Sequence, residues 1–356
     1  MALALEAARR GWGRTAPNPM VGAVIVREGK VEGVGWHERY GGAHAEVMAL
    51  DAAGDRARGA TMYVTLEPCA HFGKTPPCAT ALVRAGLARV VIAVRDPNPE
   101  ARGGVEKLRA AGIRVEFGLM AEQARELNAP FFFSFVSERP WVTLKLALSL
   151  DGAMADAKGE SKWITNDASR AEVHAMRAGV EAIAVGINTA LKDDPLLTVR
   201  AVAQASMPPA RVIFDRRARL PLDSQLARTA RSAPTVLVTE SAPPARRRAL
   251  ERLGVDVIQA VSLEESLFQL RSRGIRALLV EGGRTLAVAL LERALVDRLV
   301  IFQAPVILGA GALRPFDRMP AADIAGARAL RIVERKAFGG DLMTVYALQE
   351  LPCSPD

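Results

Sequence analysis

The chain has 356 residues, of which 50% are hydrophobic and 24% are charged. This profile is ordinary for a globular protein, and the length favours two domains over one. No apolar run reaches membrane-spanning length, so no membrane association is expected. The first ten residues carry acidic and basic side chains where a signal peptide needs an apolar segment, so they predict a helix in a cytoplasmic protein. Three cysteines in this length suit a reducing compartment.

The formal net charge is +8, which has three explanations. Nucleic-acid binding is the first. The second is a solvated helix face in an arginine-rich protein. It is favoured because the arginines are dispersed and the longest basic run, Arg246–Arg248, falls on a predicted helix. Affinity for small phosphorylated ligands is the third.

The first half of the chain alternates predicted strands and helices. Strands are expected at residues 21–26, 31–36, 61–66, 89–94 and 113–117, with the first two forming a hairpin. Helices are expected at residues 1–11, around 44–46, from Pro68, at 104–111 and at 120–128. This alternation predicts a layered α/β domain.

The second half is also α/β and shows no internal repeat. Strands are expected at residues 141–150, 182–186, 211–215, 235–239, 255–260, 277–281, 299–308 and 342–348, and helices at about 167–178 and 284–293, with 191–195 as a loop.

Phe131–Phe135 is the densest aromatic cluster in the chain. We interpret it as an apolar anchor at a domain junction, although a stacking platform for nucleic-acid bases is an alternative. The boundary is expected at Arg139-Pro140, which gives domains of residues 1–139 and 140–356.

The stretch from His44 to Cys78 contains the residue types of a zinc hydrolytic site. His44, Cys69 and Cys78 would supply one imidazole and two thiolates, which leaves the fourth tetrahedral position for water. Glu46 lies two residues from His44 and is the candidate proton shuttle, as in the His-x-Glu…Pro-Cys…Cys pattern of nucleobase deaminases. The alternatives are a core histidine with two buried thiols, or a Cys69–Cys78 disulfide.

Eight residues separate the two cysteines, where the common deaminase spacing is two. This loop contains His71, Lys74 and Thr75, so it can place a cation and a hydroxyl beside the metal for a phosphorylated substrate. A solvated turn is the alternative, because the loop also contains Gly73 and a proline pair.

A second candidate site follows the predicted strand that ends at Glu281. Two glycines and a helix N-terminus come next, and such a turn can bind an anion through unpaired backbone N–H groups. Arg284 and Thr285 would add donors. The pattern lacks the GxGxxG fingerprint of a Rossmann domain, and an ordinary Gly-Gly turn is the alternative.

The chain resembles the bifunctional deaminase–reductases of riboflavin biosynthesis nearly from end to end. In the first half the resemblance rests on Ala16-Pro-Asn-Pro-Met-Val-Gly22, Gly35-Trp-His37, His44-Ala-Glu46 and Glu67-Pro-Cys-Ala-His-Phe-Gly-Lys-Thr-Pro-Pro-Cys78. In the second half it rests on Lys145-Leu-Ala-Leu-Ser-Leu-Asp-Gly152, Ser161-Lys-Trp-Ile-Thr165, Asp193-Asp-Pro195 and Glu281-Gly-Gly283. The long cysteine spacing separates this family from cytidine and tRNA-adenosine deaminases.

The resemblance implies a cytidine-deaminase-like three-layer α/β/α domain followed by a dihydrofolate-reductase-like α/β domain. The first would hydrolyse the 2-amino group of 2,5-diamino-6-ribosylamino-4(3H)-pyrimidinone 5′-phosphate with one Zn²⁺ per chain and Glu46 as proton donor. The second would reduce the ribosyl side chain with NADPH. Asn18, His37, Lys74 and Thr75 would hold the deaminase substrate.

The resemblance also implies the reductase contacts. The cofactor contacts would be Ala147, Trp163, Thr189, Asp193, Gly283, Arg284, Thr285, Leu286, Ala287, Val288 and Ala289. The substrate contacts would be Ser161, Arg177, Leu197, Arg200 and Glu281. Arg177 and Arg200 can grip a phosphate bidentately, and Trp163 can stack on a flat ring. Lys145 and Asp193 are candidates for positioning or proton supply, or else members of structural ion pairs.

Two features depart from the family pattern. The turn after Asp96-Pro-Asn-Pro99 is short and reads Glu-Ala-Arg-Gly-Gly104, and Arg216 stands where the family often has a serine. Competing hypotheses are a nucleic-acid or nucleoside deaminase with an accessory binding domain, and a second half that is only a scaffold. The partners expected are phosphorylated pyrimidines, with no nucleic acid and no membrane, and we expect a homo-oligomer, either a dimer or a tetramer.

Overall fold

A computed structural model describes residues 1–72, 76–162, 164–200, 208–320 and 322–351. The chain divides into two compact units, which we call unit 1 (Met1–Ser137) and unit 2 (Glu138–Glu350). No helix in the described ranges is both long and apolar enough to cross a membrane.

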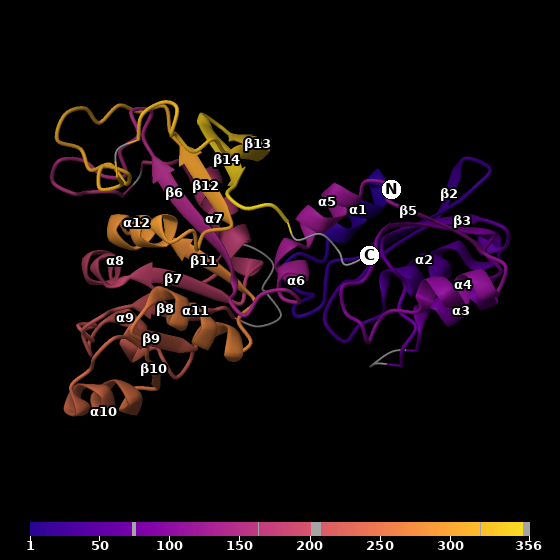
Figure 1. The fold of residues 1–356 in the computed structure, drawn as a ribbon, viewed down its shortest axis with the longest axis horizontal. Helices are drawn as coiled ribbons and strands as arrows, with labels where there is room; N and C mark the ends of the chain where they lie inside the picture. The colour runs from indigo at the N-terminus through magenta and orange to yellow at the C-terminus, as the bar shows by residue number, and fades with distance from the viewer. Residues whose placement is uncertain (73–75, 163, 201–207, 321, 352–356) are drawn as a thin grey trace. The chain divides into compact units, whose positions relative to one another are not determined.

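Unit 1 is built on a five-stranded sheet with the order β2-β1-β3-β4-β5 (Figure 1). β1 runs antiparallel to both β2 and β3, which confirms the predicted hairpin, whereas β3, β4 and β5 are parallel. The strands are β1 (Gly22–Arg27), β2 (Lys30–Trp36), β3 (Thr61–Leu66), β4 (Arg89–Val94) and β5 (Arg114–Phe117). The helices are α1 (Ala2–Arg9), α2 (Ala45–Ala53), α3 (Cys78–Ala85), α4 (Gly104–Ala110), α5 (Ala121–Leu127) and α6 (Ala129–Phe133), and a 3₁₀ turn covers Gly54–Ala57.

Two apolar clusters lie on opposite faces of this sheet. Because side chains alternate along a strand, Ile92 of β4 packs with α2, α3 and α4, whereas Ala93 packs with α1, α5 and α6. Helices therefore cover both faces, which confirms the expected α/β/α layering.

The prediction of a helix from Pro68 is wrong. Residues 67–70 are irregular, and the helix begins only at Cys78, after Pro77. The N-terminus of α4 takes up the space beside Pro68 instead, since a Cβ atom at Gly104 would lie 1.8 Å from the Pro68 carbonyl oxygen. Only glycine permits this close approach between residues 104 and 68, and the contact lies next to Cys69.

Unit 2 is built on a nine-stranded sheet with the order β10-β9-β8-β7-β11-β6-β12-β14-β13 (Figure 1). The strands from β10 to β12 are parallel to their neighbours, and β14 and β13 are antiparallel additions at one edge. The strands are β6 (Trp141–Leu148), β7 (Ala182–Gly186), β8 (Ala210–Phe214), β9 (Thr235–Thr239), β10 (Val255–Gln259), β11 (Ala277–Glu281), β12 (Arg298–Gln303), β13 (Arg331–Phe338) and β14 (Asp341–Ala347). The helices are α7 (Asp167–Ala178), α8 (Ile187–Asp193), α9 (Gln225–Arg228), α10 (Pro244–Arg252), α11 (Leu263–Ser272) and α12 (Arg284–Glu292).

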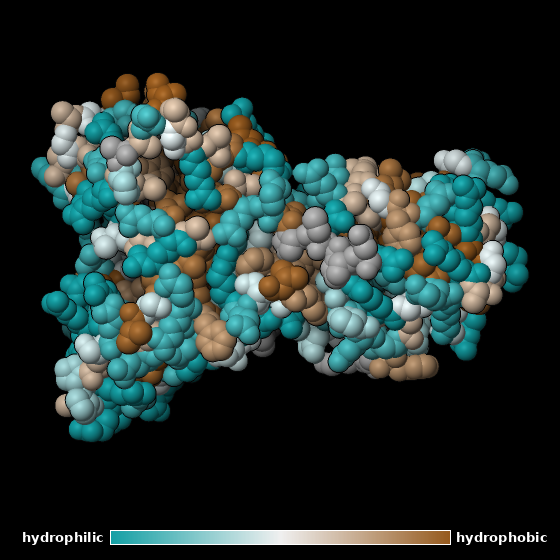
Figure 2. All heavy atoms as spheres, viewed as in Figure 1, coloured by the Kyte–Doolittle hydropathy of each residue, from teal (hydrophilic) through white to brown (hydrophobic). Residues whose placement is uncertain are grey.

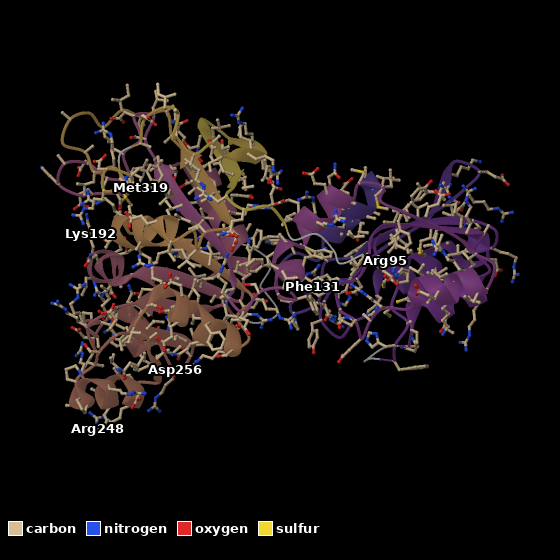
Figure 3. All side chains as sticks on the ribbon, in the orientation of Figure 1. Arg95, Phe131, Lys192, Arg248, Asp256 and Met319 are labelled. Carbon is tan, nitrogen blue, oxygen red and sulfur yellow. The ribbon has the colours of Figure 1, made fainter. Side chains whose placement is uncertain are left out.

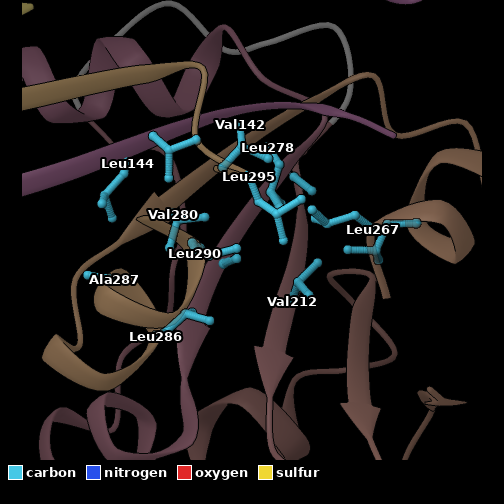
Figure 4. Packing of buried hydrophobic residues seen from close by; sticks show 14 of the residues in the cluster. Val142, Leu144, Val212, Leu267, Leu278, Val280, Leu286, Ala287, Leu290 and Leu295 are labelled. Carbon is cyan, nitrogen blue, oxygen red and sulfur yellow. The ribbon is translucent and has the colours of Figure 1, made fainter. Parts of the chain in front are cut away.

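The main core of unit 2 joins the central strands to α11 and α12. Figure 4 shows Leu144 of β6 and Val280 of β11 close to Leu286 and Leu290 of α12. A second cluster on the other face brings Ile183 and other strand residues against α8, α9 and α10. Unit 2 is therefore also layered, and hydrophilic residues cover much of its face in Figure 2.

Two predictions for unit 2 need correction, and one strand was missed. Residues 191–193 are the last turn of α8, not a loop, and the αL residue Asp194 ends that helix. The strand expected to reach residue 308 ends at Gln303. β13 was not predicted, because its exposed sequence Arg-Ile-Val-Glu-Arg-Lys-Ala-Phe carries no buried alternation.

Candidate functional sites

His44, Cys69 and Cys78 come together in unit 1. His44 is the N-cap residue of α2, Cys69 follows β3, and Cys78 is the first residue of α3. The His44 Nδ1 atom lies 3.2 Å from the Cys78 sulfur and 3.7 Å from the Cys69 sulfur. The three ligand atoms all lie within 4.8 Å of one another. Ligand atoms of a tetrahedral zinc ion are about 3.3–3.8 Å apart, so this group fits that metal.

Both cysteines are free thiols, so the disulfide alternative is wrong. Hydrogen bonds, the largest from Cys78, lower the pKa of Cys69 to about 4, and the same interaction raises the pKa of Cys78. Cys69 is therefore ready as a thiolate, whereas Cys78 would lose its proton on binding a metal cation.

Glu46 lies in the first turn of α2 and is only 3% exposed. Burial raises the pKa of Glu46 to about 7, while the neighbouring His44 acts in the opposite direction. A carboxyl group with this pKa can both accept and donate a proton near neutrality, which suits a shuttle.

A cavity of about 270 Å³ opens beside this group and is lined by Asn18, His37, His44, Glu46 and Cys69, among others. The Nδ1 atom of His37 lies 3.0 Å from the Ala43 carbonyl oxygen, so it donates, and Nε2 accepts from the Asn18 amide at 3.3 Å. The ring of His37 packs edge-on against that of His44 at 5.5 Å. Lys74 and Thr75 lie outside the described residues.

Several residues that line the cavity were not predicted as site residues. They include Glu67, Asp96, Asn98 and Phe131. Glu67 follows β3 and Asp96 follows β4, so position after a parallel strand was a usable signal. One carboxylate oxygen of Glu67 is buried without a hydrogen-bond partner among the described residues.

Unit 2 has a larger cavity of about 690 Å³ at the carboxyl ends of its parallel strands. Residues after β7, β8, β9 and β11 line it, and open α/β sheets bind ligands at this edge. Of the expected cofactor contacts, the lining includes Thr189, Gly283, Arg284, Thr285, Leu286 and Ala289.

The Gly-Gly turn has the expected form, with Gly283 as the N-cap residue of α12. Its φ of 81° suits glycine, and a Cβ atom there would lie 2.9 Å from the Thr189 hydroxyl oxygen. Ala287 and Val288 are buried behind this turn, whereas Ala147 and Asp193 are not among the described lining residues. Trp163 lies outside the described part of the chain.

Five arginines outnumber two acidic residues, Asp215 and Glu240, in the lining of the second cavity. Arg216, Arg217 and Arg219 follow β8, and Arg284 and Arg293 belong to or follow α12. Arg216, which was left out of the predicted site, donates to Glu240 at 2.5 and 3.0 Å.

Lys145, Arg177 and Glu281 form a largely buried cluster of ionisable side chains. Glu281 and Lys145 are register partners on β11 and β6, and Arg177 of α7 donates from Nε and Nη2 to the Glu281 carboxylate. Burial alone would raise the pKa of Glu281, but Arg177 and Lys145 lower it, whereas burial lowers the pKa of Lys145. The cluster therefore places a carboxylate whose pKa is lowered beside the basic side chains of Arg177 and Lys145.

The other expected substrate contacts are dispersed around Arg177. Its Nη1 donates to the carbonyl oxygen of Thr198 at 2.9 Å, and Thr198 lies between Leu197 and Arg200 in the sequence. The backbone N–H of Arg200 donates to His174 Nδ1 at 3.2 Å, and Leu197 is buried. Ser161 is half-buried, and none of the described contacts joins it to this cluster.

Comparisons with known proteins match both units. Residues 1–94 match the family model of the cytidine and deoxycytidylate deaminase zinc-binding region, and residues 140–344 match that of the RibD C-terminal domain. The riboflavin biosynthesis protein RibD of Aquifex aeolicus is 47% identical over 313 residues, with 87% of each chain covered. The Escherichia coli protein is 42% identical over 336 residues, with 88% of each covered. The chain belongs to the RibD family.

Solved structures agree with this assignment. RibD of Acinetobacter baumannii (form 1) has a TM-score of 0.85 and 39% identity, with 98% of each chain covered. The deaminase/reductase of Thermotoga maritima has a TM-score of 0.84 and 36% identity, with 99% of this chain and 97% of that chain covered. The family resemblance, the fold class and a bifunctional deaminase–reductase of riboflavin biosynthesis are thus confirmed.

Proposed function

We propose that unit 1 deaminates 2,5-diamino-6-ribosylamino-4(3H)-pyrimidinone 5′-phosphate and that unit 2 then reduces the ribosyl side chain with NADPH. The observation that supports this division of the two reactions is the presence of two separately lined cavities. One contains a His-Cys-Cys group with a buried acid, and the other is a cationic cavity at strand ends. These fit a hydrolytic deamination and a dinucleotide-dependent reduction respectively.

In the deaminase cavity, His44, Cys69 and Cys78 would hold one Zn²⁺, which when bound supplies Lewis-acid activation of water near neutral pH. Glu46 moves the protons, taking one from the attacking water and giving one to the departing amino group. Its burial keeps bulk water from competing for these transfers. The Asn18 amide and His37, which are hydrogen-bonded to each other, contact the pyrimidine.

In the reductase cavity, the dinucleotide would lie across the carboxyl ends of β7, β8 and β11, with a phosphate at the Gly283 turn and the N-terminus of α12. NADPH supplies the hydride when bound. We assign the 2′-phosphate of NADPH to Arg216, because this arginine lines the cavity and a guanidinium binds phosphate groups well. Glu240 holds this guanidinium in place.

The largely buried Lys145–Glu281–Arg177 cluster supports binding of the phosphorylated sugar. A guanidinium has five N–H donors, and the bonds described for Arg177 use three of them. Two donors can therefore reach a substrate oxygen without breaking the pair with Glu281. Lys145 is the candidate group for contacting the sugar carbonyl or supplying a proton.

The test uses the purified full-length chain. Ammonia release would be measured with the diaminopyrimidinone phosphate, and NADPH and NADH oxidation with its deaminated product. We expect turnover of both substrates, about one zinc per chain and a clear preference for NADPH. Deamination of cytidine or single-stranded nucleic acid, with no turnover of the pyrimidinone phosphate, would favour the nucleic-acid or nucleoside deaminase instead.

Location and assembly stay predictions. We propose a cytoplasmic homo-oligomer, a dimer or a tetramer, whose partners are phosphorylated pyrimidines and not nucleic acid or membrane. Light scattering on the eluting protein would give the oligomeric state, and a gel-shift assay with single-stranded DNA would detect nucleic-acid binding.

A further inference from the structure

Part of the deaminase cavity comes from beyond the matched deaminase region, which ends at residue 94. Asp96, Asn98, Ala101 and Phe131 all line the cavity. Phe131 belongs to α6, near the end of unit 1 (Figure 3). The last helix of unit 1 therefore contributes to the site as well as to the fold.

Asn128 lies between α5 and α6 and is 5% exposed. Its Oδ1 atom accepts a hydrogen bond from the Met20 backbone N–H at 2.8 Å, and its Nδ2 atom donates to the Met20 carbonyl oxygen at 2.8 Å. Only one orientation of the amide can make both bonds, since one end must accept and the other must donate. The side chain is thus fixed against one residue that lies 108 positions earlier in the sequence.

Met20 needs such a partner because the sheet does not provide one. β1 begins at Gly22, and its ladder to β2 starts with Gly22 and Trp36. The Asn128 amide therefore pairs with Met20 as the backbone of a neighbouring strand would. Asn18, Pro19 and Val21, which flank Met20, all line the cavity.

The same asparagine also begins the segment that carries Phe131. Its carbonyl oxygen accepts from the Phe132 N–H at 3.1 Å in the first turn of α6. Phe131 packs edge-on against Phe132 at 5.7 Å and against Phe135 at 5.2 Å. Asn128 thus links two segments, Asn18–Val21 and α6, each of which contributes side chains to the cavity.

We propose that Asn128 is a positioning residue for the deaminase, which acts by holding Asn18 and Phe131 in place around the pyrimidine. This rests on the proposed deaminase function. Asn128 does not line the cavity among the described residues, so it would act on substrate binding and not on proton transfer.

The test is a double-mutant cycle on the full-length chain, with Asn128→Ala, Asn18→Ala and the double variant. We expect Asn128→Ala to raise the KM for deamination by about tenfold, the scale of one or two lost hydrogen bonds, with kcat little changed. Because Asn128 acts partly through Asn18, the double variant should raise KM by clearly less than the product of the two single effects. Bound zinc and reductase turnover on the deaminated substrate should stay at wild-type levels.

Two further variants sharpen the result. Asn128→Asp keeps the acceptor but loses the donor to the Met20 carbonyl, so its KM should also rise. Gln123→Ala, at an exposed position of α5, is the matched control and should change nothing.

The proposal is overturned if both Asn128 variants keep the wild-type KM, or if the effects of Asn128→Ala and Asn18→Ala multiply fully. Loss of zinc or of reductase turnover in both Asn128 variants would also overturn it, since that shows a general role in folding. A wild-type chain that fails to deaminate the pyrimidinone phosphate would instead contradict the proposed function itself.

Discussion

Glu46→Gln should separate the two chemistries of this chain. Glutamine keeps the volume and a hydrogen-bonding amide, but it cannot exchange protons near pH 7. Glu46 is 3% exposed, so water from the solvent has little access to take over its proton transfers. Its pKa of about 7 makes both of its protonation states available at neutral pH. General acid–base groups contribute about 10²–10⁴-fold to the rate. The loss corresponds to about 3–5 kcal/mol in the barrier to deamination.

The assay follows NADPH absorbance with each substrate in turn. Supplied with the deaminated aminouracil phosphate, Glu46→Gln should oxidise NADPH at a near-wild-type rate, because the cavity of unit 2 uses other residues. Supplied with the diaminopyrimidinone, it should oxidise little NADPH, because the reductase substrate would not form. Zinc should stay bound, since Glu46 is not one of the three grouped ligands.

Asp51→Asn is the matched control, because Asp51 is an exposed acid on the same helix. It should leave both rates unchanged. Equal loss of NADPH oxidation with both substrates in Glu46→Gln would show one coupled site and refute two independent chemistries. Loss of zinc from that variant would refute the assignment of Glu46 as a shuttle.

Three further predictions test the remaining assignments. Cys69→Ala should lose bound zinc and deamination but keep NADPH binding, and stoichiometric zinc in that variant would show the ligand assignment to be wrong. Arg216→Ala should raise the KM for NADPH about tenfold and leave that for NADH unchanged, with the exposed Arg248→Ala on α10 as a silent control (Figure 3). Glu281→Gln should destabilise unit 2 by about 3–5 kcal/mol, because it leaves the largely buried Arg177 without its carboxylate. Calorimetry of the full chain would measure this loss of stability. An unchanged thermal unfolding transition would show that the Arg177–Glu281 pair is not needed for stability.

The metal ligands could be predicted from the sequence because they lie in short motifs anchored to regular elements. His44 caps a helix, and Cys69 follows a strand whose bounds, Thr61–Leu66, were predicted correctly. The same local signals failed at Pro68, where the tertiary approach of Gly104 fixes an irregular backbone in place of a helix.

Contacts between residues far apart in the chain could not be predicted from the sequence. Arg177 and Glu281 were both expected at the reductase site, but nothing in their spacing of 104 residues shows that they pair. Asn128 gave no signal at all, since a polar residue at a helix end is normally read as a cap or a solvated position. Its role depends on Met20, which only the folded chain brings next to it.

Both cavities arise from one structural cause. In each unit, parallel strands end side by side, and the segments after them are free of the ladder and can carry functional side chains. In unit 1, Cys69 follows β3 and Asp96 follows β4. In unit 2, Arg216 follows β8 and Gly283 follows β11. Helices then begin at the same edge, with Cys78 as the first residue of α3 and Gly283 as the N-cap of α12. Their N-terminal N–H groups favour negative charge. The Cys78 N–H donates to the Cys69 sulfur at 3.4 Å and stabilises the Cys69 thiolate, and the N-terminus of α12 would stabilise a phosphate. The difference in chemistry therefore lies in the side chains at the strand ends, not in the architecture that presents them.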